Sequence, residues 1–313
     1  MSIICAGLAC FDQFFFIDGA IKENFKKYSH QFMDTGGGPC GNAAYLLGIW
    51  GEKPYFAGKI GKDTFGEVLL GEFKDADVDT RLVARPEQFS TVMSAIVVNN
   101  ESGSRTIITR KEADSEEAFI PDLQYFKQVN GIKPKVILMD GHEVAISKLI
   151  AEANPNANTV LDAGKLKPEL LKLLPVTSHL VASEQFINEY SESEDWQKDD
   201  SKLLAIFKDL KSRMREDANV YVTLGENGCA YLGEGKIKRL SAFKVKAVDT
   251  TGAGDIFHGA FCFGLVRGWE DEKILTFASA TSALSIQKQG VRCAIPELKE
   301  VFDLTESEKL QSC

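Results

Sequence analysis

Short apolar runs rich in Val, Ile and Tyr alternate with helix-like stretches along most of this 313-residue sequence. Continuous apolar runs are typical of strands buried on both faces of a parallel sheet, which are joined by right-handed helical crossovers. We therefore predict a doubly wound, mostly parallel α/β fold. The expected strands are Ile3–Ala9, Tyr55–Lys59, Val136–Asp140, Thr159–Asp162, His179–Ala182 and Val220–Leu224. The expected helices are Gly41–Trp50, Phe65–Lys74, Ala145–Ala153, Glu169–Leu174, Ser201–Arg215, Gly254–Arg267 and Asp271–Lys288.

Two regions interrupt this alternation. Thr91–Val98 and Arg105–Arg110 are β-like and flank the polar turn 99–104, which predicts a hairpin. Residues 12–35 form a second β-like, aromatic stretch that ends at a glycine cluster. The two regions could form a small β-sheet lid outside the main sheet, or the hairpin could lie at the edge of the main sheet.

The composition excludes several classes of partner and site. The net charge is −9 and no block of Lys or Arg occurs, which disfavours nucleic acid and anionic membranes as partners. No apolar stretch reaches the length of a membrane span. The seven cysteines are odd in number and lack a C-x-x-C pair, which indicates reduced thiols and a cytoplasmic protein. None of the four histidines has metal-ligand spacing with another.

The first glycine cluster is Thr35–Ala44, with the sequence TGGGPCGNAA. It matches the dinucleotide pattern G-x-G-x-x-G, but no strand comes immediately before it, so hydride chemistry on a Rossmann site is disfavoured. Glycines expose backbone groups and Asn42 both donates and accepts, which favours contact with a polyol. The alternative is a tight turn before a helix. The segment Gly58–Gly66 lacks the Gly-Lys-Ser/Thr of a P-loop and predicts a helix capped by Asp63 or Thr64.

The cluster Val248–Ala260, VDTTGAGDIFHGA, carries the strongest chemical signal. Gly252, Ala253 and Gly254 directly precede a helix expected to begin near Asp255, and the N–H groups at a helix N-terminus bind anions. Asp255 could simply favour the helix start by its charge, by about 0.3–1 kcal/mol. That role does not require Gly-x-Gly before it. Phosphoryl transfer does need donors around the transferred group and a carboxylate that accepts the hydroxyl proton, so Asp255 is the candidate catalytic base.

These motifs resemble the two signatures of the ribokinase-like (PfkB) carbohydrate kinases. Asp249–Ala260 is similar to the second signature and Gly37–Ala43 to the first, over two hundred residues apart. The likeness also includes Gly7 to Asp12, Gly58–Gly66 and Val222–Gly228, and so covers essentially the whole chain. It implies the ribokinase-like fold, with a main domain of residues 1–11, 36–89 and 112–313 and a lid of residues 12–35 and 90–111. The implied activity is ATP-dependent phosphorylation of a hydroxyl on a small sugar.

The resemblance also implies roles for individual residues. Asp255 would take the proton of the acceptor hydroxyl, and the backbone of Gly252, Ala253, Gly254 and Asp255 would hold the charge of the transferred phosphoryl group. The implied substrate contacts are Asp12, Gly37, Gly38 and Asn42, and the implied ATP contacts are Thr223, Gly225 and Gly228. Asp249 and Thr251 match positions that hold a monovalent cation such as K⁺, and Mg²⁺ would accompany ATP.

Two features bear on the metal and the substrate. Relatives often carry Asn-x-x-Glu for metal and phosphate, whereas this chain has Ser183, Glu184, Gln185 and Phe186 there. Either Glu184 substitutes or ATP and water hold the metal. The motifs are most similar to fructokinase-like and sulfofructose-kinase-like members. Arg105 and Arg110, the latter with Lys111, suit an anionic substrate or are solvated residues of the lid.

A ketose or related sugar is the expected substrate, phosphorylated at a primary hydroxyl. The alternative within this class is a nucleoside kinase, with a base on Phe14, Phe15 or Phe16. A catalytically silent sugar or nucleotide sensor is the alternative from another class, and the intact Gly-Ala-Gly-Asp argues against it. The expected assembly is a homodimer formed through the lid.

Overall fold

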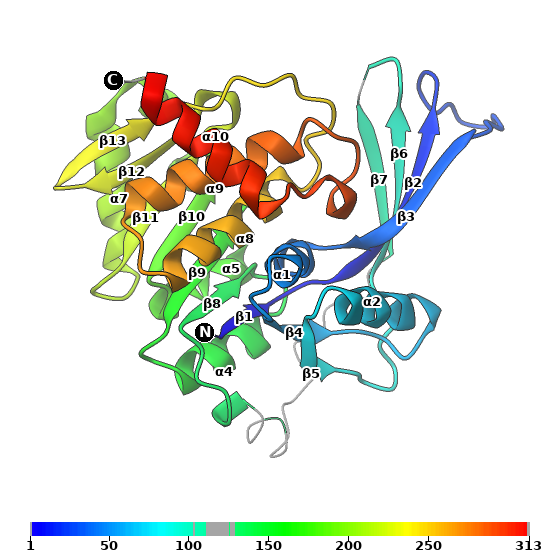
Figure 1. The fold of residues 1–313 in the computed structure, drawn as a ribbon, viewed down its shortest axis with the longest axis horizontal. Helices are drawn as coiled ribbons and strands as arrows, with labels where there is room; N and C mark the ends of the chain where they lie inside the picture. The colour runs from blue at the N-terminus through cyan, green and yellow to red at the C-terminus, as the bar shows by residue number, and fades with distance from the viewer. Residues whose placement is uncertain (1, 103, 111–124, 126–128, 312–313) are drawn as a thin grey trace.

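The computed structural model describes residues 2–102, 104–110, 125 and 129–311, and its larger sheet has nine strands (Figure 1). The order is β13-β12-β11-β10-β9-β8-β1-β4-β5. All neighbours from β11 to β5 pair in parallel, whereas β12 is antiparallel to β11 and to β13. The strands are β1 (Ile3–Ala6), β4 (Tyr55–Lys59), β5 (Asp79–Ala84), β8 (Val136–Met139), β9 (Asn158–Ala163), β10 (His179–Ser183), β11 (Asn219–Thr223), β12 (Cys229–Gly233) and β13 (Lys236–Leu240).

Helices cover both faces of this sheet because its central strands are apolar on both sides. In β1, Ile3 and Cys5 face one core while Ile4 and Ala6 face the other. The first core is closed by α1 (Pro39–Ile49), α2 (Thr64–Asp75), α8 (Ala253–Val266), α9 (Asp271–Ser285) and α10 (Leu298–Gln311). The second is closed by α4 (Val144–Ala153), α5 (Pro168–Leu171), α6 (Glu184–Ser191) and α7 (Asp200–Ser212). Parallel strands so covered are the arrangement expected of a doubly wound fold.

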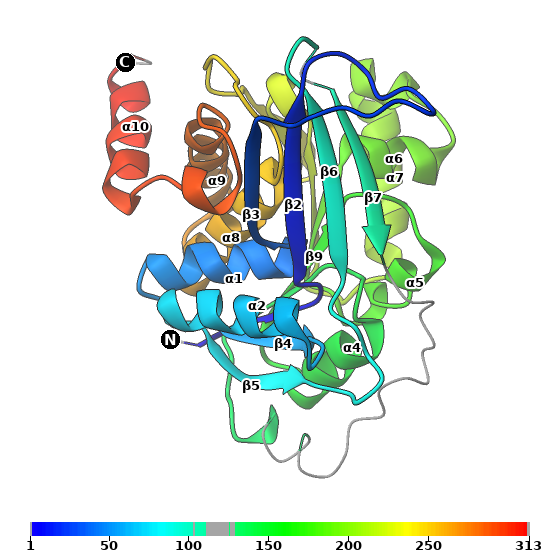
Figure 2. The same cartoon turned by 90° about the vertical axis from the view of Figure 1, so that its right-hand side faces the viewer.

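A separate four-stranded sheet, here called the small sheet, stands beside α1 and α2 (Figures 1 and 2). Its order is β3 (Gln31–Gly37), β2 (Cys10–Ile17), β6 (Met93–Asn99) and β7 (Arg105–Arg110). The two outer pairs are antiparallel, and β2 pairs with β6 in parallel. Phe14, Phe16 and Ile96 form its own apolar cluster.

The predicted fold class is therefore confirmed, and the predicted hairpin lies in the small sheet, not at the edge of the main one. The helix expected over Glu169–Leu174 is shorter. It ends at Leu171, and Leu174–Val176 forms a 3-10 turn that contains Pro175, which cannot donate an α-helical hydrogen bond. The sequence analysis missed β5, the antiparallel strands β12 and β13, and the helices α6 and α10.

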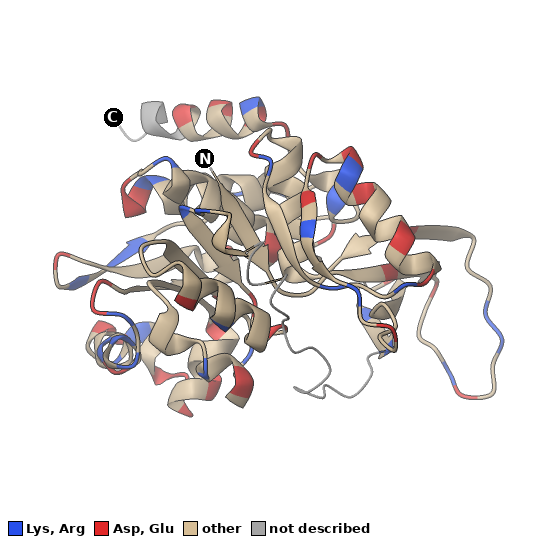
Figure 3. Cartoon of the chain, turned by 90° about the horizontal axis from the view of Figure 1, so that it is seen from below, with Lys and Arg blue, Asp and Glu red and all other residues tan. Residues whose placement is uncertain are grey.

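Charge and thiols follow the expectations from composition. Acidic and basic residues are interspersed over the outer helices in Figure 3. All six cysteines in the described residues are free thiols, with Cys293 alone exposed; Cys313 lies outside that part. None of the helices in the described residues is both long and apolar enough to cross a membrane.

Candidate active site

Asp255 lies in the first turn of α8 and does not cap that helix. The N-cap is Gly252, whose φ of +68° is left-handed, and no side chain caps this end. A Cβ on Gly252 would also stand 2.5 Å from Cγ1 of Val291, so this position requires glycine. The N–H of Ala253 makes a long 3.4 Å bond to the carbonyl of Thr250. The N–H groups of Gly254 and Asp255 belong to the first turn, which has no intrahelical acceptor for them, so this turn, here called the anion hole, is suited to bind an anion.

The Asp255 carboxyl receives a hydrogen bond from a helix on the other side of the site. Asn42 of α1 donates from Nδ2 to Oδ2 of Asp255 over 2.7 Å. Burial, followed by the nearby charge of Asp162, raises the pKa of Asp255 to about 7, against the lowering effects of Asn42 and His258. A carboxyl whose pKa lies near neutrality is well matched to general-base catalysis.

The first glycine cluster brings backbone and side chains together beside Asn42. Gly38 is the N-cap of α1 with a φ of +85°, and a Cβ there would lie 2.5 Å from the carbonyl oxygen of Leu8. A Cβ on Gly37 would collide with the Asp12 carboxylate. Burial raises the pKa of Asp12. Asp12, Gly37, Gly38 and Asn42 are thus neighbours, and they offer carboxylate, amide and backbone groups to a hydroxylated ligand.

Asp140 fixes the loops on which this cluster depends. Its Oδ2 accepts from the N–H of Leu8 at 2.8 Å and from that of Cys40 at 3.2 Å. Burial disfavours its charge, but the charge of His142 and the hydrogen bonds outweigh burial and lower the pKa to about 2. Asp140 follows β8, the neighbour of β1 at which the strand order reverses, and ligands bind at such switch points.

A cavity of about 500 Å³ extends from the anion hole along α9. Thr223, Gly225 and Gly228 line one part, and Ala253 and Gly254 line the part next to Asp255. The α9 side is formed by Ser279, Ser282 and Ala283, whose small side chains leave the space open, and by Ile286 just after the helix. Its volume is in the range of small-molecule sites.

Asp249 and Thr251 also lie together. Oδ1 of Asp249 accepts from the N–H of Thr251 at 2.9 Å and from its hydroxyl at 2.5 Å, while Oδ2 accepts from the N–H of Gly290 at 3.0 Å. Arg105 crosses from β7 of the small sheet to donate to the Thr251 hydroxyl, and its Nη1 is 3.7 Å from the Asp249 carboxylate. The small sheet therefore contacts the loop before the anion hole directly.

A model described as pfkB family carbohydrate kinase matches residues 2–298. The chain belongs to this family. It is 28% identical over 246 residues to ribokinase of Lactococcus lactis, covering 78% of this chain and 76% of that protein. It is 25% identical over 308 residues to ketohexokinase of Mus musculus, covering 92% and 97%. The pfkB-family member described here is thus an ATP-dependent carbohydrate kinase.

The fold comparison agrees with that membership. Arabidopsis thaliana ribokinase complexed with ribose and ATP superposes with a TM-score of 0.81, at 22% identity, over 97% of this chain and 98% of that one. The motifs favoured fructokinase-like members, whereas several of the relatives found are ribokinases. The pfkB assignment is independent of that difference.

One position departs from the usual pfkB pattern and cannot hold a metal. Phe186 is fully buried, and its N–H donates to Ser183, the N-cap of α6. Glu184 accepts a hydrogen bond from Gln197. The described residues include no group of three or more His, Cys, Asp or Glu that could hold a metal ion.

Arg110, the candidate for an anionic substrate, is exposed on β7 and donates to the carbonyl of Thr91 at 3.1 Å. Lys111, its expected companion, lies outside the described residues. Arg105 is the arginine of this strand that contacts the loop around Thr251.

Sequence reasoning missed four groups close to Asp255. Asp140 follows the apolar strand β8, and Asp162 lies near the end of β9. An acidic residue at the carboxyl end of a parallel strand is a sequence signal for a ligand site, so both could have been predicted. His258 is part of the Val248–Ala260 motif and lies one helical turn after Gly254, so its position could have been used. Nδ1 of His258 lies 2.6 Å from the Gly254 carbonyl oxygen. Arg292 gave no local signal, because it reaches the site only through tertiary packing.

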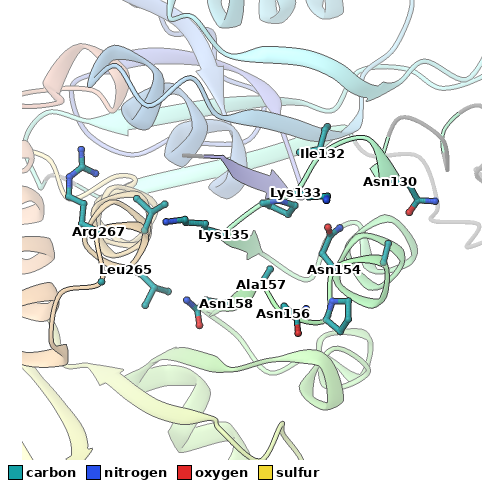
Figure 4. Close-up of a pocket in the computed structure, with 15 residues that line it drawn as sticks. Asn130, Ile132, Lys133, Lys135, Asn154, Asn156, Ala157, Asn158, Leu265 and Arg267 are labelled. Atoms are coloured by element: carbon teal, nitrogen blue, oxygen red, sulfur yellow. The ribbon is translucent and has the colours of Figure 1, made fainter.

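A second concavity is remote from this site (Figure 4). It lies where β8 and β9 begin and α8 ends, so the part of α8 from Asp255 to Val266, about 17 Å of helix, separates it from Asp255. Lys133, Lys135 and Arg267 line it together with several asparagines. Arg267 already pairs with Glu52.

Proposed function

We propose that this kinase transfers the γ-phosphoryl group of ATP to a primary hydroxyl of a ketose or related sugar, with Asp255 as the base. The observation that carries the proposal is the position of the Asp255 carboxyl. It lies between the polyol-suited cluster around Asn42 and a 500 Å³ cavity that begins at Ala253 and Gly254. A sugar hydroxyl and a terminal phosphate would meet there.

In the proposed reaction each group has one task. Asp12, Gly37, Gly38 and Asn42 hold the sugar. Asp255 takes the proton from the attacking hydroxyl as the new O–P bond forms and the bond from the γ-phosphorus to the β–γ bridging oxygen breaks, which releases ADP. The backbone N–H groups of residues 252 to 255 hold the negative charge on the transferred group. Of these, Gly254 and Asp255 are better placed than Ala253, whose N–H already bonds weakly to Thr250.

ATP would occupy the cavity bordered by Thr223, Gly225 and Gly228. Mg²⁺ neutralises phosphate charge when bound. Because the described residues hold no metal cluster, ATP oxygens and water would be its ligands. For K⁺, three hydrogen bonds and the Arg105 guanidinium already surround the Asp249 carboxylate, so the ion would bind there only after Arg105 moves aside. A comparison of turnover in K⁺, Na⁺ and Tris buffers tests this.

We propose that residues 12–35 and 90–111 act as a lid over the sugar, because Arg105 reaches from β7 to Thr251. Closure would exclude water, which competes with the sugar as acceptor. We also propose a homodimer through the outer face of the lid, the face opposite Asp12, where Phe32 and Ile108 are both more than half exposed. Light scattering of Ile108→Lys against the unmodified chain tests the dimer. A cytoplasmic location is consistent with the free thiols.

A nucleoside kinase is the second candidate, and one observation favours it. Side chains alternate along a strand, so Phe14 and Phe16 lie on the same face of β2 as Asp12. That face carries aromatic rings next to the proposed sugar site, and both rings are buried in the cluster with Ile96, so a base would have to displace their present neighbours to stack on them.

Coupled ADP release measured with ketoses, aldopentoses, sugar acids and nucleosides decides between these candidates. A preference for a ketose by kcat/KM supports the proposal. If ribose is the best acceptor, the enzyme is a sugar kinase but the proposed ketose substrate is wrong. If a nucleoside is the best acceptor, the nucleoside-kinase function replaces the proposed one. Ligand binding without any turnover would support a silent sensor.

A further inference from the structure

Arg292 is a buried charge that the proposed reaction does not use. It begins a 3-10 turn after α9, is only 6% exposed, and its guanidinium lies over the rings of Tyr45 at 4.8 Å and Phe73 at 5.3 Å. Burial lowers its pKa, against the opposing effect of Glu72. A charge buried this deeply is costly unless its partners are well placed.

The partners of Arg292 belong to two parts of the candidate site. Nη1 pairs with the Glu72 carboxylate of α2, and both oxygens of Glu72 accept from the N–H of Gly36, at 3.1 and 3.0 Å. Gly36 lies at the end of β3, where the small sheet joins α1. Nε of Arg292 donates to Oδ1 of Asn42 at 3.3 Å. Nη2 is buried and has no hydrogen-bond partner in the described part of the chain.

This geometry determines which end of the Asn42 amide faces Asp255. Oδ1 of Asn42 accepts from Arg292, so Nδ2 is left to donate to the Asp255 carboxylate at 2.7 Å. A flipped amide would place its NH₂ against the guanidinium and its oxygen against the carboxylate, losing both hydrogen bonds. The side chain of Asn42 is 3% exposed, so water has little access to replace them.

We propose that Arg292 is a positioning residue for the base: through its Nε it fixes the amide of Asn42 so that Nδ2 donates to Asp255. The proposal rests on the proposed role of Asp255. Because Asn42 donates to the charged form of the carboxyl, the loss of this orientation raises the pKa of Asp255. The other groups that act on Asp255 come from separate elements: Asp162 of β9, Asp140 after β8, His258 of α8 and Cys10 of β2. None of them is altered in the test below.

Three substitutions separate the Nε hydrogen bond from the charge of Arg292. Arg292→Gln carries an NH₂ at the same number of bonds from Cα as Nε, but no charge. Arg292→Met has a methyl group at that place, and Arg292→Lys has a methylene there yet keeps a charge beside Glu72. If the hydrogen bond matters, glutamine behaves as the unmodified enzyme, while methionine and lysine do not.

The readout is the pH dependence of kcat/KM, measured by ADP release with D-fructose and with D-ribose. For the Arg292→Met and Arg292→Lys variants we expect the acid limb of the kcat/KM profile to move to higher pH by about one unit. At pH values below that limb, kcat/KM is then about tenfold lower than in the unmodified enzyme, and at high pH it changes little. The glutamine variant should keep the unmodified limb. Two outcomes would overturn the proposal. One is an equal loss of kcat/KM at every pH. The other is an unmodified acid limb in Arg292→Lys together with a shifted limb in Arg292→Gln, which would mean that the charge matters and the hydrogen bond does not.

Two controls make the result unambiguous. The pH dependence of the unfolding free energy reports the pKa of Asp255 without any substrate, and it applies to whichever of the three variants fold. Asp255→Asn tests the underlying role. If that variant keeps turnover, the proposed base is wrong. If Asp255→Asn is inactive and all three Arg292 variants have the same acid limb as the unmodified enzyme, the role of Asp255 stands and only the proposed role of Arg292 is wrong.

Discussion

Asn42 donates a 2.7 Å hydrogen bond from Nδ2 to Oδ2 of Asp255, which joins the helix after the first glycine cluster to the helix after the second. The two residues are separated by 213 positions in the sequence. One belongs to the proposed sugar site and the other to the anion hole. The bond therefore places the proposed base at the boundary between the two substrates.

Asp255→Asn should abolish most turnover, because asparagine keeps the shape of the site but cannot accept the hydroxyl proton. We expect kcat to fall by about 10²–10⁴-fold, the usual contribution of a general base. ATP affinity, measured by calorimetry, should change little. Asp77→Asn, at an exposed residue paired with Lys53, is the matched control and should leave kcat unchanged. Near-normal turnover of Asp255→Asn would refute the assignment.

The same substitution should stabilise the protein at neutral and alkaline pH. The pKa of Asp255 rises from 3.8 to about 7 on folding, so between these values the folded state holds a proton that the unfolded state releases. Stability contributed by this group therefore falls as pH increases through that range. We expect Asp255→Asn to raise the unfolding free energy by about 1–4 kcal/mol at pH 8 and much less at pH 4. Urea unfolding at both pH values measures this. An equal gain at both would contradict the raised pKa.

Gly252→Ala should be more harmful than alanine at another glycine with a similar backbone. Gly252 and Gly51 both have positive φ, +68° and +83°. A Cβ at Gly252 would meet Val291, whereas nothing lies within 4 Å of a Cβ at Gly51. Gly51→Ala should cost about 1 kcal/mol from backbone strain alone. Gly252→Ala should cost about 2–4 kcal/mol and also lower kcat. Equal losses in thermal unfolding would mean that the Val291 contact is unimportant.

Arg110→Ala should raise KM mainly for anionic acceptors, because a guanidinium on β7 recognises carboxylate or phosphate. Arg105→Ala is the natural comparison. Because Arg105 contacts Thr251, we expect this substitution to raise KM for ATP with any acceptor. Steady-state kinetics with a neutral sugar and a sugar acid separate the two effects. If Arg110→Ala affects both acceptors equally, Arg110 does not recognise substrate charge.

The sequence predicted the parallel core because its signal is local. In β1, β8 and β11 the apolar residues are contiguous, and each run lies in a strand as expected. The hairpin β12–β13 was missed because Lys236–Leu240 is short and has three charged residues among five, which is typical of an edge strand and gives no apolar run. The helix α6 was missed because its sequence is polar, and only Phe186 and Ile187 are buried.

The candidate site shows the same division. Asp255 and the glycines around it were found because their spacing is itself the signal. Arg292 was missed because its contacts, with Glu72 and Asn42, come from helices more than two hundred residues earlier. A buried arginine has no periodic pattern, and its role depends on packing that no window of sequence contains.

The parallel pairing of β2 with β6 has a consequence for how the chain is made. The strand of residues 10–17 cannot pair with residues 93–99 until the intervening β3, α1, β4, α2 and β5 have been made, of which β4 and β5 belong to the main sheet. Contacts of such long sequence separation form slowly because loop closure costs entropy. On the ribosome, β2 can pair early with β3, but its other edge would lack β6 until nearly a third of the protein has emerged. Chaperone dependence of early synthesis would follow from this one strand pairing.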